Sequence, residues 1–137
     1  MFSVALIRDR YRSLGTERGS AVAEFAMVSG LLILLFLAAF QVGFSLFVRN
    51  TLIADAAEGA RHGARVNETP ATGAQRAQAL IRSSVSTRYA QRVTGSLEAR
   101  DGVRVVVIRV DAPLPVIGPF GPSQRLTVSA RAYQEKQ

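Results

Sequence analysis

The chain has 137 residues, which leaves room for one small domain beside a membrane segment. Its 17 Lys and Arg residues outnumber 10 Asp and Glu, and a net charge of +7 permits nucleic acid or an anionic membrane surface as a partner, although the arginines form no dense run. The lack of cysteine excludes disulfides, thiolate catalysis and zinc–thiolate sites, and a single histidine excludes a His-rich metal site.

A long apolar stretch follows a basic N-terminal segment. Residues 25–48 are 24 consecutive uncharged positions. As an α-helix rising ~1.5 Å per residue they would extend ~36 Å, enough to cross a hydrocarbon core of ~30 Å. The stretch is preceded by four arginines: Arg8, Arg10, Arg12 and Arg18. The positive-inside rule therefore predicts a single-pass protein in the lipid bilayer, with its N-terminus in the cytoplasm and its C-terminal domain outside.

Glu24 stands at the edge of this apolar stretch, directly before Phe25. An ionised carboxylate that enters a bilayer is costly unless it is paired, so Glu24 is a candidate functional residue. Alternatively it lies at headgroup level near a helix N-terminus, where the helix dipole favours an acid. Position alone does not separate these two interpretations.

The residues around Glu24 resemble the processing site of type IV pilin-like precursors. They read Arg18-Gly19-Ser20-Ala21-Val22-Ala23-Glu24-Phe25 before the apolar stretch. The resemblance implies cleavage between Gly19 and Ser20 by a prepilin peptidase, which makes Glu24 the fifth residue of the mature chain. It also implies that Glu24, beside Phe25, pairs with the N-terminal amine of a neighbouring subunit and so sets the axial register of an assembly.

The helical pattern continues beyond the membrane segment, to about residue 65. Glu58 and Arg61 have the i, i+3 spacing of a favourable helical pair. Small residues recur every four positions, in one set at Ala56, Ala60 and Ala64 and in another at Gly59 and Gly63. Such surfaces let helices approach closely. The pattern fits a helix packed on its own domain and a subunit interface equally well.

Residues 47–65 resemble the signature of TadE-like proteins, minor pseudopilins of the tight-adherence (Tad/Flp) pilus system. The most specific part is Ala56-Ala57-Glu58-Gly59-Ala60-Arg61. Near the C-terminus, residues 118–122 and 126–130 also resemble the family's closing strand. The chain departs from the family at Ser29-Gly30, where proline is common, and at Gln41, where an acid is common. The resemblance therefore implies no second intramembrane carboxylate here.

The remaining sequence predicts a small α+β region. Residues 67–73 form a turn-rich break, and residues 74–90 have the spacing of an amphipathic helix with arginines on its polar face. Residues 96–100 and 103–110 flank Asp101-Gly102, a pair typical of a tight primed hairpin turn. A proline-rich loop at 113–122 then precedes a strand at 125–133. The predicted fold class is α+β: a long N-terminal helix with a transmembrane half and an exposed half, a second amphipathic helix, and a small three-stranded antiparallel sheet.

We expect four segments: a cytoplasmic leader at 1–19 that is cleaved after Gly19, a transmembrane helix at 20–48, a helix extension outside the membrane at 49–66, and an exterior α+β domain at 67–137. No catalytic, cofactor-binding or metal-binding motif is visible, so we expect neither an enzyme nor a cofactor.

The resemblance implies a minor pseudopilin-like assembly component in the bacterial cytoplasmic (inner) membrane, able to enter a pilus or a related secretion apparatus. Its implied partners are other pilin-like subunits, the prepilin peptidase and the inner-membrane assembly platform. Two alternatives stay open: a membrane-anchored basic protein that handles DNA at the cell surface, and an unprocessed signal-anchored structural protein. We do not expect nucleic acid as a partner, because solvated arginines on an amphipathic helix explain the basic face.

Overall fold

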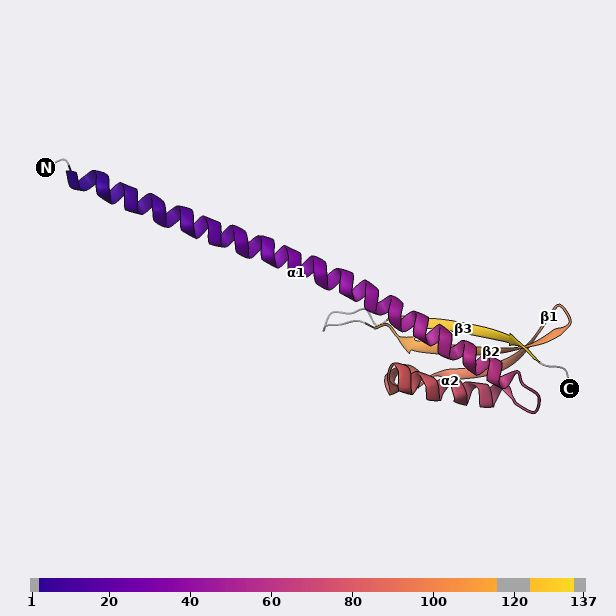
Figure 1. Ribbon diagram of the computed structural model, residues 1–137. Helices are drawn as coiled ribbons and strands as arrows, with labels where there is room; N and C mark the ends of the chain where they lie inside the picture. Colours follow the sequence, from indigo (N-terminus) through magenta and orange to yellow (C-terminus); the bar gives the residue numbers. More distant parts are fainter. Residues whose placement is uncertain (1–2, 116–123, 135–137) are drawn as a thin grey trace. The chain divides into compact units, whose positions relative to one another are not determined.

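The computed structural model describes residues 3–115 and 124–134, with side chains from residue 18 onward. Its elements are α1 (Ser3–Gly63), α2 (Pro70–Ser84), the 3₁₀ helix η1 (Thr87–Ala90), β1 (Val93–Arg100), β2 (Val103–Pro113) and β3 (Arg125–Tyr133) (Figure 1). The predicted α+β class, with a long first helix, a second helix and three antiparallel strands, is confirmed. The chain divides into two compact units, Met1–Phe40 (the first unit) and Gln41–Gln137 (the second unit).

The first unit consists of the N-terminal part of α1. The helix begins at Ser3, well before residue 20, where the sequence pattern predicts the start of the transmembrane helix. No proline occurs before Pro70, so nothing in this part of the sequence forces a helix to begin or end. Large apolar side chains here are exposed, with exposed fractions of 74% at Phe25 and 65% at Leu34. With a mean hydropathy of 2.5 in its most apolar window, α1 is long and apolar enough to cross a membrane.

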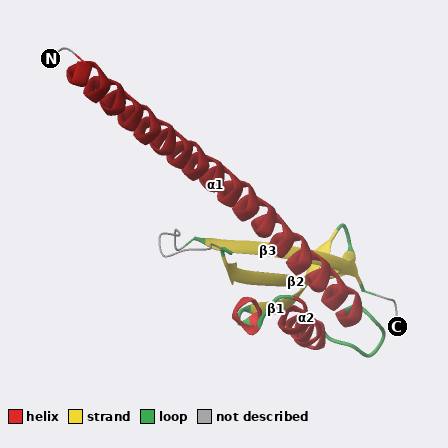
Figure 2. Ribbon diagram, turned by 60° about the vertical axis from the view of Figure 1, so that its left-hand side comes forward, coloured by secondary structure: helices red, strands yellow, loops and turns green. Residues whose placement is uncertain are grey.

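In the second unit, α2 and the C-terminal part of α1 lie side by side on one face of the sheet (Figures 1 and 2). Both helices and the inner sheet face contribute to one apolar core. Its largest fully buried members are Val48, Leu52, Ile81, Val106, Ile108 and Val110. Since α1 supplies two of these residues, Val48 and Leu52, the sheet does not form its core with α2 alone.

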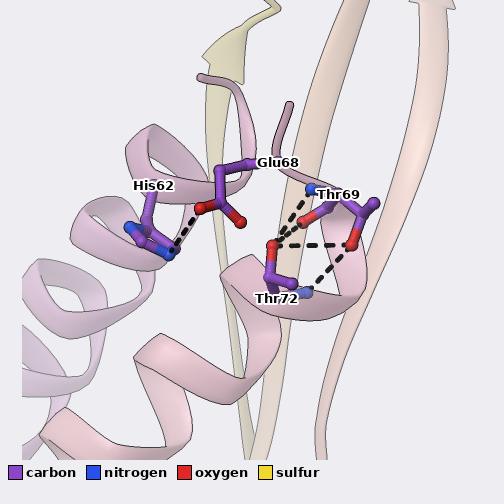
Figure 3. A network of polar contacts seen from close by, with 4 residues as sticks. All are labelled: His62, Glu68, Thr69 and Thr72. Carbon is purple, nitrogen blue, oxygen red and sulfur yellow. Dashed lines mark hydrogen bonds and ion pairs between the residues drawn. The ribbon is translucent and has the colours of Figure 1, made fainter. Parts of the chain in front are cut away.

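Helix α2 begins earlier than the sequence pattern predicts. Thr69 is its N-cap and Pro70 its first residue, so the predicted break at 67–73 is too long. The Thr69 Oγ1 accepts from the Thr72 backbone N–H at 3.2 Å, and the Thr72 Oγ1 accepts from the Thr69 N–H at 3.0 Å (Figure 3). This reciprocal cap satisfies two N–H groups that a helix start leaves unpaired, and proline is favoured at the first helical position.

The end of this helical region also differs from the predicted 74–90 segment. Helix α2 stops at Ser84, and Tyr89 is buried from η1 instead. Ala77 and Ile81 are buried while Arg76 and Arg82 are exposed, which confirms the predicted amphipathic pattern within α2. Only Val85 and Ser86 separate α2 from η1. The Ser83 and Ser84 hydroxyls donate to the Leu80 carbonyl oxygen in the last turn of α2, and such side-chain hydrogen bonds compete with continuation of a helix.

The sheet has the order β1-β2-β3, with both neighbouring pairs antiparallel. The hairpin turn has positive φ at Asp101 (52°) and Gly102 (77°), as a primed two-residue turn requires, so this prediction is confirmed. Strand β1 starts at Val93, three residues before the predicted Ser96, and passes through Gly95. A Cβ at Gly95 would lie 2.0 Å from the Pro70 carbonyl oxygen, so glycine there admits the start of α2 against the sheet.

The connection between β2 and β3 is described only at its ends. Strand β2 extends to Pro113, so the predicted loop begins later than residue 113. The Leu114 N–H donates to the Gln124 carbonyl oxygen at 3.1 Å and closes the base of the connection. Residues 118–122, one of the two C-terminal segments that resemble TadE-like proteins, lie outside the described residues. The other, residues 126–130, lies in β3.

Candidate functional site in helix α1

The segment that resembles a prepilin processing site lies on one exposed stretch of α1. Gly19, Ser20, Glu24 and Phe25 are all exposed. The Ser20 hydroxyl donates to a Glu24 carboxylate oxygen at 3.3 Å, one helical turn away. Nothing lies within 4 Å of the position that a Cβ on Gly19 would occupy. The backbone around Gly19 is therefore accessible, and the Glu24 carboxylate retains lone pairs for a further partner.

The signature residues Ala57 to Arg61 belong to the second unit. Glu58 and Arg61 form an ion pair at 3.1 Å, as their spacing predicts, and their side chains are 39% and 63% exposed. Ala60 is fully buried, whereas Ala57 is half-buried against the core. The same short segment thus supplies a buried face to its own domain and an exposed charged pair to solvent.

Gly59 and Gly63 are positioned where α1 crosses α2. A Cβ at Gly59 would lie 2.6 Å from both the Ala77 Cβ and the Gly73 carbonyl oxygen. A Cβ at Gly63 would lie 2.8 Å from the Thr69 carbonyl oxygen. The glycines therefore let the two helix backbones touch, as small residues spaced by four do in other close helix pairs.

The packing of α1 on α2 decides between the two interpretations of the small-residue pattern, a helix packed on its own domain and a subunit interface. Ala56, Ala60 and Ala64 are buried in the core of the second unit, and both glycines pack on α2. Within the described residues the small-residue surfaces of α1 are thus used inside the domain. Gly73, which the sequence pattern places in a turn, is the partner of Gly59 in α2; the matching four-residue spacing of Gly73 and Ala77 is the signal that could have identified it.

A polar notch in the apolar stretch was missed by sequence reasoning. The Gln41 side-chain amide donates to the Pro115 carbonyl oxygen, and the Ser45 hydroxyl donates to the Gln41 carbonyl oxygen at 2.9 Å. We call Gln41, Ser45 and Pro115 the polar notch. An ionised acid at position 41, which is common in the resembling family, could not donate this hydrogen bond. A polar pair four residues apart within an apolar run was the available signal.

The remaining polar contacts near the signature are local. His62 lies 3.7 Å from a Glu68 carboxylate oxygen, beside the cap of α2 (Figure 3). In the part of the chain that the structure describes, no group of three or more His, Asp or Glu side chains is arranged to hold a metal ion. The polar contacts of this region thus stabilise the ends of helices and the packing of neighbouring helices.

Gly19, Glu24 and Gly59 all lie in one stretch of α1. The same stretch matches a known protein family. Residues 19–61 match the family model of TadE-like protein. No curated protein and no solved structure matches the chain. The TadE-like match begins at Gly19 and ends at Arg61, so it includes Glu24, Gln41 and Gly59 but not Gly63 or Ala64.

The match covers residues 19–61 and shows that this segment of the chain is similar to TadE-like proteins. Helix α1 is compatible with a single-pass membrane anchor. The TadE-like segment contains residues of both units, since it crosses from Phe40 to Gln41.

Proposed function

We propose that the chain is a minor pseudopilin-like structural or assembly component of a Tad/Flp pilus or a related secretion apparatus. The single observation that carries the proposal is the TadE-like match beginning at Gly19, with an exposed carboxylate at Glu24 directly before an exposed apolar helix. A helix in the core of a soluble domain would bury these apolar residues.

The proposed topology follows from charge and length. Residues 1–19 form a cytoplasmic leader removed after Gly19, residues 20–48 form the transmembrane segment, and residues 49–66 and 67–137 lie outside the bacterial inner membrane. Arginines cluster before the apolar stretch, which favours a cytoplasmic N-terminus. The partners are other pilin-like subunits, the prepilin peptidase and the membrane assembly platform.

Gly19 supports the proposed cleavage site in two ways. It is accessible, and as a helical glycine it makes the surrounding helix less stable than alanine would by about 0.5–1 kcal/mol. A peptidase must draw its substrate out of helical conformation before it can reach the scissile carbonyl. Local unwinding at Gly19 is therefore easier than at the neighbouring alanines of the same helix.

Glu24 is proposed to set register rather than to add affinity. Cleavage after Gly19 creates an ammonium group on Ser20, and Glu24 of a neighbouring subunit is its counter-charge. Two unit charges at 4 Å attract by about 4 kcal/mol at an effective dielectric of 20, but desolvation consumes much of this gain. A mismatched register leaves both charges unpaired at the lipid edge, which is the costly state. The pair thus penalises wrong alignments strongly.

The proposal is tested by neutralising Glu24 in cells that assemble the apparatus. We expect Glu24→Gln to insert into the membrane and lose its leader normally, yet to fail to co-assemble with other pilin-like subunits. Glu24→Asp is the matched control, because it keeps the carboxylate charge at this position. Co-purification with the assembled apparatus, after the processed N-terminus is verified, is the measurement. Wild-type co-assembly of Glu24→Gln would refute the role of the pair.

A further inference from the structure

The second unit begins inside the uncharged stretch, not after it. Its first residue is Gln41, whereas the uncharged stretch continues to Val48. Val48 is fully buried in the core of the second unit, and Phe44 packs against that core. About two turns of α1 therefore belong both to the apolar stretch and to the folded domain.

These two turns have two distinct faces. One face carries the polar notch residues Gln41 and Ser45 together with Val48, and it contacts the domain. On an α-helix the positions 42, 46 and 47 fall on the opposite side. Their side chains are apolar and exposed: Val42 (61%), Leu46 (54%) and Phe47 (57%). The exposed apolar surface ends at Arg49 and Asn50, which are exposed polar residues.

The length of the stretch places this region at lipid depth. At ~1.5 Å per residue, Gln41 comes ~24 Å after Phe25 and Phe47 comes ~33 Å after it, while a hydrocarbon core is ~30 Å thick. If the Glu24 carboxylate marks the inner edge of the bilayer, Val42 lies within the hydrocarbon core, and Leu46 and Phe47 lie at its outer boundary. The domain-facing side of the same turns is then already occupied by protein.

The polar notch fits such a location. At this depth an unpaired amide or carbonyl group would be costly, because no water is available to bond it. The Gln41 amide and the Pro115 carbonyl oxygen satisfy each other, and the Ser45 hydroxyl lies 3.5 Å from the same carbonyl oxygen. Pro115 is buried and brings no N–H of its own. The connection thus meets the helix with its polar groups paired.

Charge at the same end of the sheet suits a phospholipid surface. Arg125 opens β3 opposite Pro113, next to the base of the connection, and it is exposed. Arg49 is exposed on α1 just past the apolar face. Arginines immediately beyond an apolar face can bind anionic headgroups at the membrane surface. An apolar protein partner would gain nothing from these two charges.

Resting on the proposed membrane anchor, we infer that the second unit lies directly in the outer lipid interface, with no linker between the membrane-spanning part of α1 and the folded domain. The membrane-contacting edge consists of the exposed apolar face of α1 (Val42, Leu46 and Phe47) and the half-buried Leu114 at the base of the β2–β3 connection. Its partner is the bilayer itself, with hydrocarbon at the apolar face and anionic headgroups at Arg49 and Arg125. The Gln41–Pro115 hydrogen bond holds the connection to the helix at that level.

Depth-dependent quenching tests this inference with the full chain in vesicles. The chain has no cysteine, so single cysteines can carry an environment-sensitive nitrobenzoxadiazole label without background. The vesicles contain phosphatidylglycerol, phosphatidylethanolamine and a nitroxide lipid, with the nitroxide near the top of the acyl chain or, for the Leu34 control, near the end of the chain. The test variants are Leu114→Cys and Phe47→Cys. Arg100→Cys, beside the hairpin turn at the other end of β2, is the aqueous control, and Leu34→Cys is the anchor control.

We expect the Leu114 label to be quenched and blue-shifted as the Phe47 label is, with the Arg100 label unquenched. If the Leu34 label is quenched but the Leu114 label behaves like the Arg100 label, α1 spans the membrane but the second unit does not contact it. The inference is then wrong, and another subunit must cover the apolar face. If the Leu34 label is also unquenched, the anchor fails, and the proposed function and this inference fail together.

Discussion

The two halves of helix α1 use apolar residues in opposite ways. In the first unit the apolar side chains are large and exposed, as at Phe25, Leu31 and Phe36. In the second unit the α1 residues that face the core are smaller on average, and most of those after Leu52 are alanine or glycine, buried except for the half-buried Ala57. A single helix therefore changes its surroundings along its length without changing its secondary structure.

This comparison shows that side-chain size distinguishes the exposed half of α1 from the half that packs in the second unit. Large side chains meet no shape constraint where they are exposed. Against α2, by contrast, only hydrogen and methyl groups fit, because the backbones touch at Gly59 and Gly63. The predictions below compare matched substitutions in the two regions.

The largest contrast is expected between two leucine truncations. Leu52 is fully buried, whereas Leu34 is 65% exposed. Leu52→Ala should lower the free energy of unfolding of the second unit by about 2–5 kcal/mol, because it removes buried methyl groups and leaves a cavity. Leu34→Ala should leave that free energy unchanged. Denaturant unfolding in detergent micelles, followed by a signal from the sheet, is the measurement. Equal effects of both truncations would contradict the division of α1.

A second contrast adds a methyl group to glycines of the same helix. Gly59→Ala should destabilise the second unit by about 1–3 kcal/mol, since its Cβ would overlap Ala77 and the Gly73 backbone. Gly43→Ala has no atom within 4 Å of the new Cβ, so the higher helix propensity of alanine should make it neutral or stabilising by up to about 1 kcal/mol. The same unfolding experiment separates them, and a neutral Gly59→Ala would show that the helix crossing is looser than the structure indicates.

A smaller effect is expected at the start of α2. Thr69→Ala removes the reciprocal cap with Thr72 and should cost about 1 kcal/mol of stability. Thr51→Ala is the matched control, because the Thr51 hydroxyl only donates to the Phe47 carbonyl oxygen within α1. Thermal unfolding should show a lower Tm for Thr69→Ala alone. Identical Tm values for both variants would mean that the cap adds nothing to the packing of α2.

The smallest effect on stability is expected at the exposed ion pair of the signature. Arg61→Ala should change the free energy of unfolding by no more than about 0.5 kcal/mol, since exposed i, i+3 pairs contribute little. Under the proposed function, a loss of co-assembly with normal stability would identify the Glu58–Arg61 pair as part of a subunit contact. Arg76→Ala, an exposed arginine on α2, is the control for charge alone. A large stability loss in Arg61→Ala would place the pair inside the domain instead.

The sequence predicted those features that depend on periodicity and on local turn chemistry. The three strands, the Asp101-Gly102 turn and the amphipathic face of α2 follow from patterns within a few residues, and all three are present. The features it missed depend on contacts between distant segments. The sequence pattern predicts that the first strand begins after Gly95, because no neighbouring residue indicates that the Pro70 backbone packs against this glycine.

The candidate site shows the same limit. Glu24 was recognisable because a charge beside an apolar stretch is a local signal. The role of Gln41 was not, because its partner Pro115 lies 74 residues further along the chain. The start of α2 was a local signal that was overlooked: a threonine directly before a proline is a favoured way to begin a helix.

The most direct test of the account is the intact mass of the protein purified from membranes of cells with and without the prepilin peptidase. With the peptidase present, we predict a mature chain that begins at Ser20 and lacks residues 1–19. Without it, the chain should retain the leader. A chain that keeps its leader in peptidase-containing cells which assemble the pilus would contradict the proposal, because Glu24 would then have no newly formed amine to pair with.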